Sequence, residues 1–133
     1  MIKLFIGGKG SGKTKTLIEL VNNAADTSKG SVVCIEKGNN LNLDITYKAR
    51  LIDTDFYSVY DAEALYGFIA GILASNTDIT DVFVDSALKI CANDVAAFEA
   101  MLKKCENIAK DVNLVMTASI AVEECPAGIK AYA

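Results

Sequence analysis

The residues with the clearest chemical potential lie near the start of the chain, in the segment Gly7-Gly8-Lys9-Gly10-Ser11-Gly12-Lys13-Thr14. This segment fits the pattern G-x-x-x-x-G-K-[ST] in full, and it lies between an expected strand and an expected helix. Such glycines let backbone N–H groups turn inward around phosphates, and the start of the helix adds partial positive charge. We expect Lys13 to reach the β- and γ-phosphates of a nucleotide and Thr14 to offer its hydroxyl to Mg²⁺. A glycine-rich turn without a ligand is the alternative.

A second candidate element is the apolar strand in the segment Asp81–Ser86, which ends at Asp85. A carboxylate at the end of such a strand can enter the coordination shell of Mg²⁺. Asp81 precedes the strand and is expected to be a solvated turn residue. Asp85 could instead cap the turn that follows. We predict that Thr14 and Asp85 hold the metal and that Lys13 and Asp85 belong to the catalytic set.

With these two elements the chain resembles the P-loop nucleoside triphosphatases, where they are called the Walker A and Walker B motifs. Many P-loop ATPases place a catalytic glutamate directly after the Walker B aspartate, but this chain has Ser86 there. The segments Val82–Ser86 and Val32–Glu36 resemble the RecA-like (ASCE) branch, whose water-activating glutamate ends the strand after the P-loop helix. This resemblance implies Glu36 as the general base. The alternative is a charged residue that leaves a strand for solvent.

The segment Leu114–Ser119 resembles the sensor strand that RecA-like folds insert between the P-loop strand and the Walker B strand. The resemblance implies that Thr117 or Ser119 contacts the γ-phosphate or the attacking water, and we assign Thr117 to the nucleotide site. Threonine is also favoured in strands for its shape alone. Arg50, the only arginine, could act as an arginine finger in a neighbouring subunit or be an isolated surface residue.

The absence of certain motifs narrows the choice of nucleotide and of reaction type. There is no Asn-Lys-x-Asp segment, and no Asp-x-x-Gly begins at Asp85, so the GTPase patterns fail and ATP is expected. A Mg²⁺-dependent ATPase is the leading hypothesis. A nucleotide-binding switch or adaptor that does not hydrolyse ATP is the alternative. A small-molecule kinase is a weaker one, because a lid over the phosphates usually needs several arginines.

The whole chain resembles small bacterial ATP-binding proteins that are labelled as twitching-motility (pilus-retraction) ATPases. Motors of that kind carry a further domain and a histidine-containing motif, and this sequence has no histidine. The resemblance therefore implies the nucleotide site at residues 7–14 and 85, and not a motor function. A protein partner or a second copy of the chain is expected to act with it.

Strands and helices must alternate to position these residues. Apolar runs predict four strands, and helical spacing predicts three helices. The pattern of the first begins at Lys13, includes Ala24, and fades at Asn22–Asn23 and over the polar segment Asp26–Gly30. Asp61 is the expected N-cap of the second helix, and Asn93 or Asp94 that of the third. Residues 48–52 could form an edge strand or a loop, and the tail after Pro126 is expected to add little. The predicted strands are Ile2–Ile6, Ser31–Ile35, Val82–Val84 and Leu114–Ala118. This alternation predicts a three-layer α/β/α fold around a mainly parallel sheet of about four or five strands.

Composition limits the class of protein. At 133 residues and 52% hydrophobic residues, we expect a single domain over 1–133. The net charge of −4 argues against nucleic acid as the main partner, although Lys9, Lys13 and Lys15 should attract a nucleotide locally. Absence of histidine excludes histidine catalysis. The four cysteines form no CxxC pair, and no apolar run could span a bilayer, so we expect a cytoplasmic protein without membrane insertion.

Overall fold

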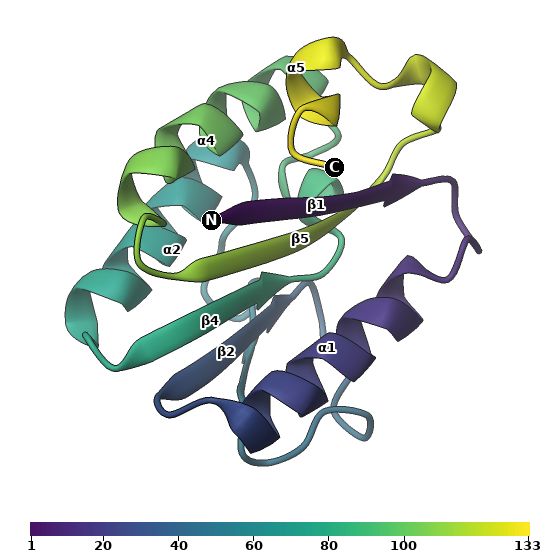
Figure 1. Cartoon of the computed structure of the whole chain (residues 1–133). Coiled ribbons are helices and arrows are strands. Elements are labelled where there is room, and N and C mark those ends of the chain that lie inside the picture. The colour runs from purple at the N-terminus through teal and green to yellow at the C-terminus, as the bar shows by residue number, and fades with distance from the viewer.

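The computed structural model describes residues 1–133 as alternating strands and helices (Figure 1). The strands are β1 (Ile2–Gly7), β2 (Ser31–Glu36), β3 (Arg50–Asp53), β4 (Ile79–Val84) and β5 (Asn113–Ser119). The helices are α1 (Lys13–Thr27), α2 (Ala62–Ser75), α3 (Ala87–Ile90), α4 (Val95–Ile108) and α5 (Ala127–Lys130), with a 3₁₀ turn at Val122–Glu124. Each predicted strand is present, and α1 ends at Thr27, within the polar segment over which the helical pattern fades; Ala24 and Ala25 still pack on the core.

The strands form one sheet in the order β1-β5-β4-β2-β3, and every pair of neighbours is parallel. The strands β1 and β2, which α1 connects, therefore do not pair, since β5 and β4 lie between them. The predicted position of β5, between the strand before the glycine-rich segment and the strand that ends at Asp85, is confirmed. The weak alternation at 48–52 corresponds to a real edge strand, β3.

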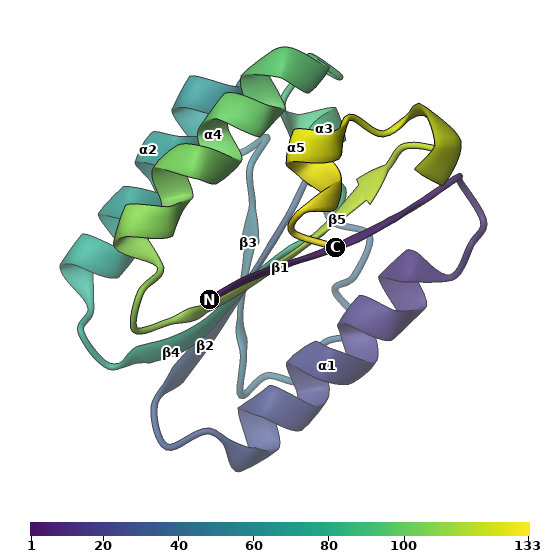
Figure 2. The same cartoon turned by 45° about the horizontal axis from the view of Figure 1, so that its top comes forward.

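Helices cover both faces of the sheet, as Figures 1 and 2 show, with α1 on one face and α2 and α4 on the other. Alternation along β2 and β4 separates the side chains into two cores. Val32, Cys34 and Phe83 pack with α1 and the segment 41–49. Val33, Ile35, Val82 and Val84 pack with α2 and α4 on the opposite face. The predicted three-layer α/β/α class with a parallel five-stranded sheet is confirmed.

The last residues contribute more than the sequence indicates. Ile129 is buried in the main core, and the backbone N–H of Leu4 donates a hydrogen bond of 2.8 Å to the carbonyl of Tyr132. This contact occupies part of the outer edge of β1, and Figure 2 shows α5 beside that strand. The expectation that the tail adds little is wrong, because it protects a sheet edge whose backbone groups would otherwise lack partners.

Two further findings concern composition. All four cysteines are buried and free, and burial raises the pKa of Cys34 and Cys91 to about 12, so they behave as small apolar residues. None of the helices has both the length and the apolar character needed to cross a membrane.

Candidate functional site

The glycine-rich segment forms the turn between β1 and α1. Gly10 and Gly12 have φ values of 80° and 84°, a left-handed conformation that glycine adopts without strain. Gly12 is the N-cap of α1; no side chain caps the helix, and its first turn contains no acidic residue. The first N–H groups of α1 therefore remain free to bind an anion, and the helix dipole favours that.

Lys13 lies over this turn. Its Nζ donates hydrogen bonds to the carbonyl of Gly8 at 2.9 Å and to Oγ of Ser11 at 3.3 Å. Partial burial lowers the pKa of Lys13, and the nearby charge of Asp85 opposes that effect. Phosphate oxygens are stronger acceptors than these neutral groups, so a phosphate placed in the turn would replace them as partners of the ammonium group.

Thr14 and Asp85 are brought together as predicted, although 71 residues separate them. The hydroxyl of Thr14 donates to the two carboxylate oxygens of Asp85, at 3.1 and 3.3 Å. Asp85 follows β4 directly and is only 8% exposed. A hydroxyl and a carboxylate are suitable ligands for Mg²⁺, which accepts one or two protein carboxylates and completes its shell with phosphate oxygens and water. No three acidic, cysteine or histidine side chains gather in a possible metal site, so this pair would rely on a bound phosphate.

Thr117 lies behind Asp85 and is 1% exposed. Its hydroxyl donates to Oδ1 of Asp85 at 2.8 Å and accepts from the backbone N–H of Ser86 at 2.7 Å. The contacts that Thr117 makes therefore orient Asp85 and the turn after it. Ser119, at the end of the same strand, lines the pocket in front of the glycine-rich turn. Direct contact between Thr117 and a phosphate stays a prediction.

Glu36 ends β2 and is only 2% exposed, so the alternative of a solvated residue at a strand end is wrong. Its Oε1 accepts from the N–H of Asn40 and its Oε2 from the N–H of Leu41, both at 3.0 Å. Burial raises the pKa of Glu36; the two N–H donors oppose this, and the charges of Asp85 and Asp53 add to it. Glu36 thus lies near Asp85 with both carboxylate oxygens already bonded.

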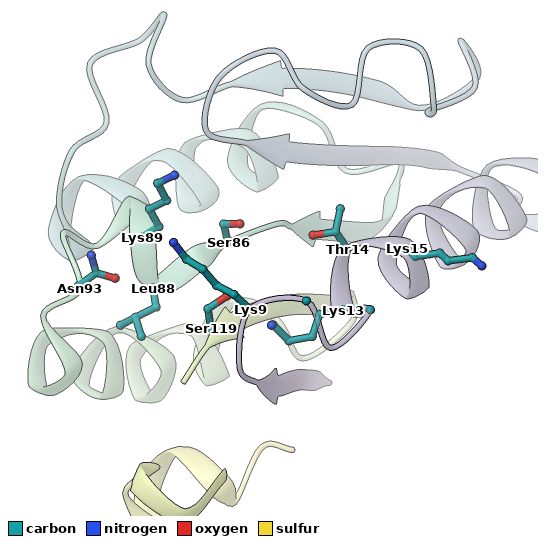
Figure 3. Close-up of a pocket in the computed structure, with 11 residues that line it drawn as sticks. Lys9, Lys13, Thr14, Lys15, Ser86, Leu88, Lys89, Asn93 and Ser119 are labelled. Atoms are coloured by element: carbon teal, nitrogen blue, oxygen red, sulfur yellow. The ribbon is translucent and has the colours of Figure 1, made fainter. Parts of the chain in front are cut away.

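A pocket of about 550 Å³ opens in front of the glycine-rich turn (Figure 3). Sequence reasoning missed Lys89 and Asn93, which approach this pocket from α3 and the turn after it. The available signal was their position just after Asp85, at the edge of the sheet where β1 and β5 also end. The residues that line the pocket are Lys9, Gly10, Gly12, Lys13, Thr14, Lys15, Ser86, Leu88, Lys89, Asn93 and Ser119.

Arg50 is not part of this arrangement. It is exposed and begins β3, where it pairs with Val33 in the sheet. The candidate residues lie beyond the carboxyl ends of the strands, whereas Arg50 lies at the amino end of β3. Its role as an arginine finger in a neighbouring subunit stays a prediction.

Comparisons with known proteins bear on the fold. No protein-family model matches the chain, and no curated protein sequence matches it. Among solved structures, that of C. elegans PCH-2 is similar to this chain, with a TM-score of 0.56 and 16% sequence identity over 99% of this chain and 33% of that one. The chain therefore spans about a third of the length of that protein. At this identity the likeness establishes the fold alone, a three-layer arrangement around a five-stranded parallel sheet.

Proposed function

We propose that the chain is a Mg²⁺-dependent ATP-binding protein of the RecA-like P-loop type and that it hydrolyses ATP. The observation that carries this proposal is the contact between Thr14 and Asp85 beside the uncapped start of α1. A P-loop NTPase-like fold supports a nucleotide-dependent function of this kind. The resemblance to proteins labelled as twitching-motility ATPases supports the nucleotide site in this proposal. We do not propose a motor function.

Each part of the glycine-rich segment has a role in this proposal. The free backbone N–H groups at the start of α1 and in the turn before it would surround the β-phosphate, and Lys13 would move its ammonium group from Gly8 and Ser11 to the phosphate oxygens. Thr14 and Asp85 provide the oxygen ligands for Mg²⁺, which would neutralise charge on the phosphates. Thr117 acts through Asp85, because its hydroxyl fixes the direction of that carboxylate.

Glu36 is the proposed general base for the attacking water. Its raised pKa suits a proton acceptor better than that of an ordinary glutamate, because a stronger base removes a proton more readily. In the present arrangement both oxygens of Glu36 accept backbone N–H groups. Each oxygen keeps a further lone pair, but Glu36 is only 2% exposed, so a water reaches this carboxylate only if the segment after β2 moves.

A second candidate function is a switch or adaptor that binds ATP without hydrolysis. The same two hydrogen bonds on Glu36 favour it, because they hold the only proposed base away from water. A protein partner or a second copy of the chain would then bind the nucleotide-loaded form, or would break the hydrogen bonds of Glu36 and so permit hydrolysis. No contact in the site specifically favours the small-molecule kinase.

The test is phosphate release from Mg-ATP by the wild-type chain, Lys13→Ala, Glu36→Gln and Lys110→Ala. Lys110 is exposed and lies outside the pocket, so its variant controls for the loss of one positive charge. Hydrolysis that is lost in Lys13→Ala and Glu36→Gln, but kept in Lys110→Ala, supports the ATPase with Glu36 as base. ATP binding without release supports the switch. ATP binding that Lys13→Ala leaves unchanged contradicts both candidates.

A further inference from the structure

More lysines line the pocket than the glycine-rich segment 7–14 contains. Four lysines line the pocket and no acidic residue does. The three ion pairs of the structure engage Lys37, Lys48 and Lys103 and leave these four without an acidic partner. Figure 3 shows Lys9 extending from the glycine-rich turn toward α3, where Lys89 lies, whereas Lys15 points away along α1. Lysines that line one pocket repel each other, and an anion bound in the pocket offsets that repulsion.

Lys89 belongs to a helix, α3, that packs tightly on the core. It is the one exposed residue of α3, and its neighbours Leu88 and Ile90 are buried in the core. The turn before α3 is also fixed, because the N–H of Ser86 donates to Thr117, which itself donates to Asp85. The backbone of Lys89 is therefore held in a constant position relative to the Thr14–Asp85 pair.

Backbone strain gathers around the same short helix. The chain has four non-glycine residues with positive φ, and three of them, Ser86, Ala92 and Asn93, flank α3 with φ values of 55°, 58° and 58°. Such conformations cost free energy, and they persist where the surrounding structure enforces them, often at ligand clamps. Here the N–H of Asn93 donates to the carbonyl of Leu88 at 2.9 Å and so closes the turn beside the pocket.

We propose that Lys89, assisted by Asn93, binds the terminal phosphate of a nucleoside triphosphate and so makes the chain distinguish a triphosphate from a diphosphate. This inference rests on the proposed nucleotide site. The N–H groups of α1 serve the β-phosphate, which ATP and ADP share, and Lys13 is expected to contact that phosphate as well as the terminal one. Lys89 lines the same pocket from α3, four residues after Asp85, and none of the ion pairs engages it, so its ammonium group is free to bind a further phosphate. Its ammonium group contributes charge, and the amide of Asn93 contributes a donor.

The test compares the dissociation constants of Mg²⁺ complexes of ADP and of the non-hydrolysable ATP analogue with a β,γ-imido bridge, measured by calorimetry. The proteins are the wild-type chain, Lys89→Ala, Lys89→Arg, Lys13→Ala and the control Lys110→Ala, with folding of each checked by circular dichroism. We expect Lys89→Ala to weaken binding of the triphosphate by about tenfold and that of ADP by less than about twofold, the size expected for one charge-assisted contact. Lys89→Arg should keep most of the preference because it keeps the charge.

The outcomes separate this inference from the function on which it rests. Equal weakening of both nucleotides by Lys89→Ala, or the loss seen equally in Lys110→Ala, would overturn the role of Lys89 and leave the nucleotide site intact. An effect of Lys89→Ala on the triphosphate alone, together with loss of both nucleotides in Lys13→Ala, supports both. Failure of the wild-type chain to bind either nucleotide would overturn the proposed function itself and the inference with it.

Discussion

The start of α1 differs from the starts of α2 and α4. Asp61 caps α2 by accepting from the N–H of Ala64 at 2.8 Å, and Asp94 caps α4 by accepting from the N–H of Ala97 at 3.0 Å. Helix α1 begins at Gly12 with no side-chain cap, and lysines replace acids in its first turn. A capped helix start satisfies its own backbone donors, whereas an uncapped one leaves them for a ligand.

The capped helix starts contribute to the stability of the fold, whereas the uncapped start of α1 is available to bind a ligand. The two aspartates contribute to folding, since each satisfies donors that would otherwise lack partners within the helix. At α1 the same contribution is absent, and the free donors lie beside four lysines and the Thr14–Asp85 pair. Substitutions at the two kinds of helix start should therefore have opposite signatures, and the predictions below test that.

The largest effect is expected at Lys13. Lys13→Ala should weaken binding of Mg-ATP by about 100-fold, because the ammonium group is expected to contact two phosphates. Its present partners are exposed atoms of its own turn, so the melting temperature should stay close to that of the wild-type chain. Calorimetric titration and thermal unfolding check the two parts. A variant that unfolds early but binds normally would contradict the assignment of α1 as the ligand-binding helix start.

A smaller effect, confined to binding in the presence of Mg²⁺, is expected at Asp85. Asp85→Asn should weaken binding of Mg-ATP by about tenfold and leave binding in EDTA almost unchanged, since the amide still accepts from Thr117 but is a poor ligand for the cation. Asp81→Asn is the matched control and should change neither, because Asp81 lies inside β4, not before the strand as the sequence indicated, and outside the pocket. Equal weakening with and without Mg²⁺ would argue against Asp85 as a metal ligand.

At the capped helices the expected effect is on stability. Asp61→Ala and Asp94→Ala should each lower the free energy of unfolding by about 1 kcal/mol, because each removes one N-cap. Urea unfolding measures this change. Affinity for nucleotide should be the same as that of the wild-type chain for both variants, since both caps lie outside the pocket. A loss of affinity at either cap would break the distinction between the two kinds of helix start.

The smallest expected effect is a pH dependence of stability that Glu36 causes. This residue accepts two backbone N–H groups as a cap does, but it is buried, which raises its pKa above the ordinary 4.5. A group whose folded pKa is raised stabilises the fold most below its unfolded pKa and loses that contribution as the pH rises through the folded pKa.

The measurement is urea unfolding of the wild-type chain and of Glu36→Gln from pH 4 to pH 8. The stability of the wild-type chain relative to Glu36→Gln should fall as the pH rises above about 4.5 and then become constant. Glu19→Gln serves as the matched control, because Glu19 is exposed and forms none of the three ion pairs. A relative stability of the wild-type chain that instead rises with pH would contradict a raised pKa for Glu36.

The sequence by itself determined the features that are encoded in short segments. The pattern of residues 7–14, the apolar strands and the caps Asp61 and Asp94 each depend on neighbours within a few positions, so local rules predict them. The alternation of strands and helices then determines the layers, because parallel strands need crossovers that cover both faces of the sheet.

The spacing of residues in the sequence does not reveal what meets across the sheet. The resemblance to P-loop nucleoside triphosphatases predicted the pairing of Thr14 with Asp85 and the place of β5, whereas only the tertiary structure showed the order β1-β5-β4-β2-β3 as a whole and the hydrogen bond from Thr117 to Asp85. Likewise, the packing of α3 on the core places Lys89 at the pocket. Glu36 is buried, and its carboxylate accepts hydrogen bonds from the N–H groups of Asn40 and Leu41 in place of water. The physical reason is that such contacts depend on the order of strands and on the burial of whole segments, which long-range packing sets and local propensity does not.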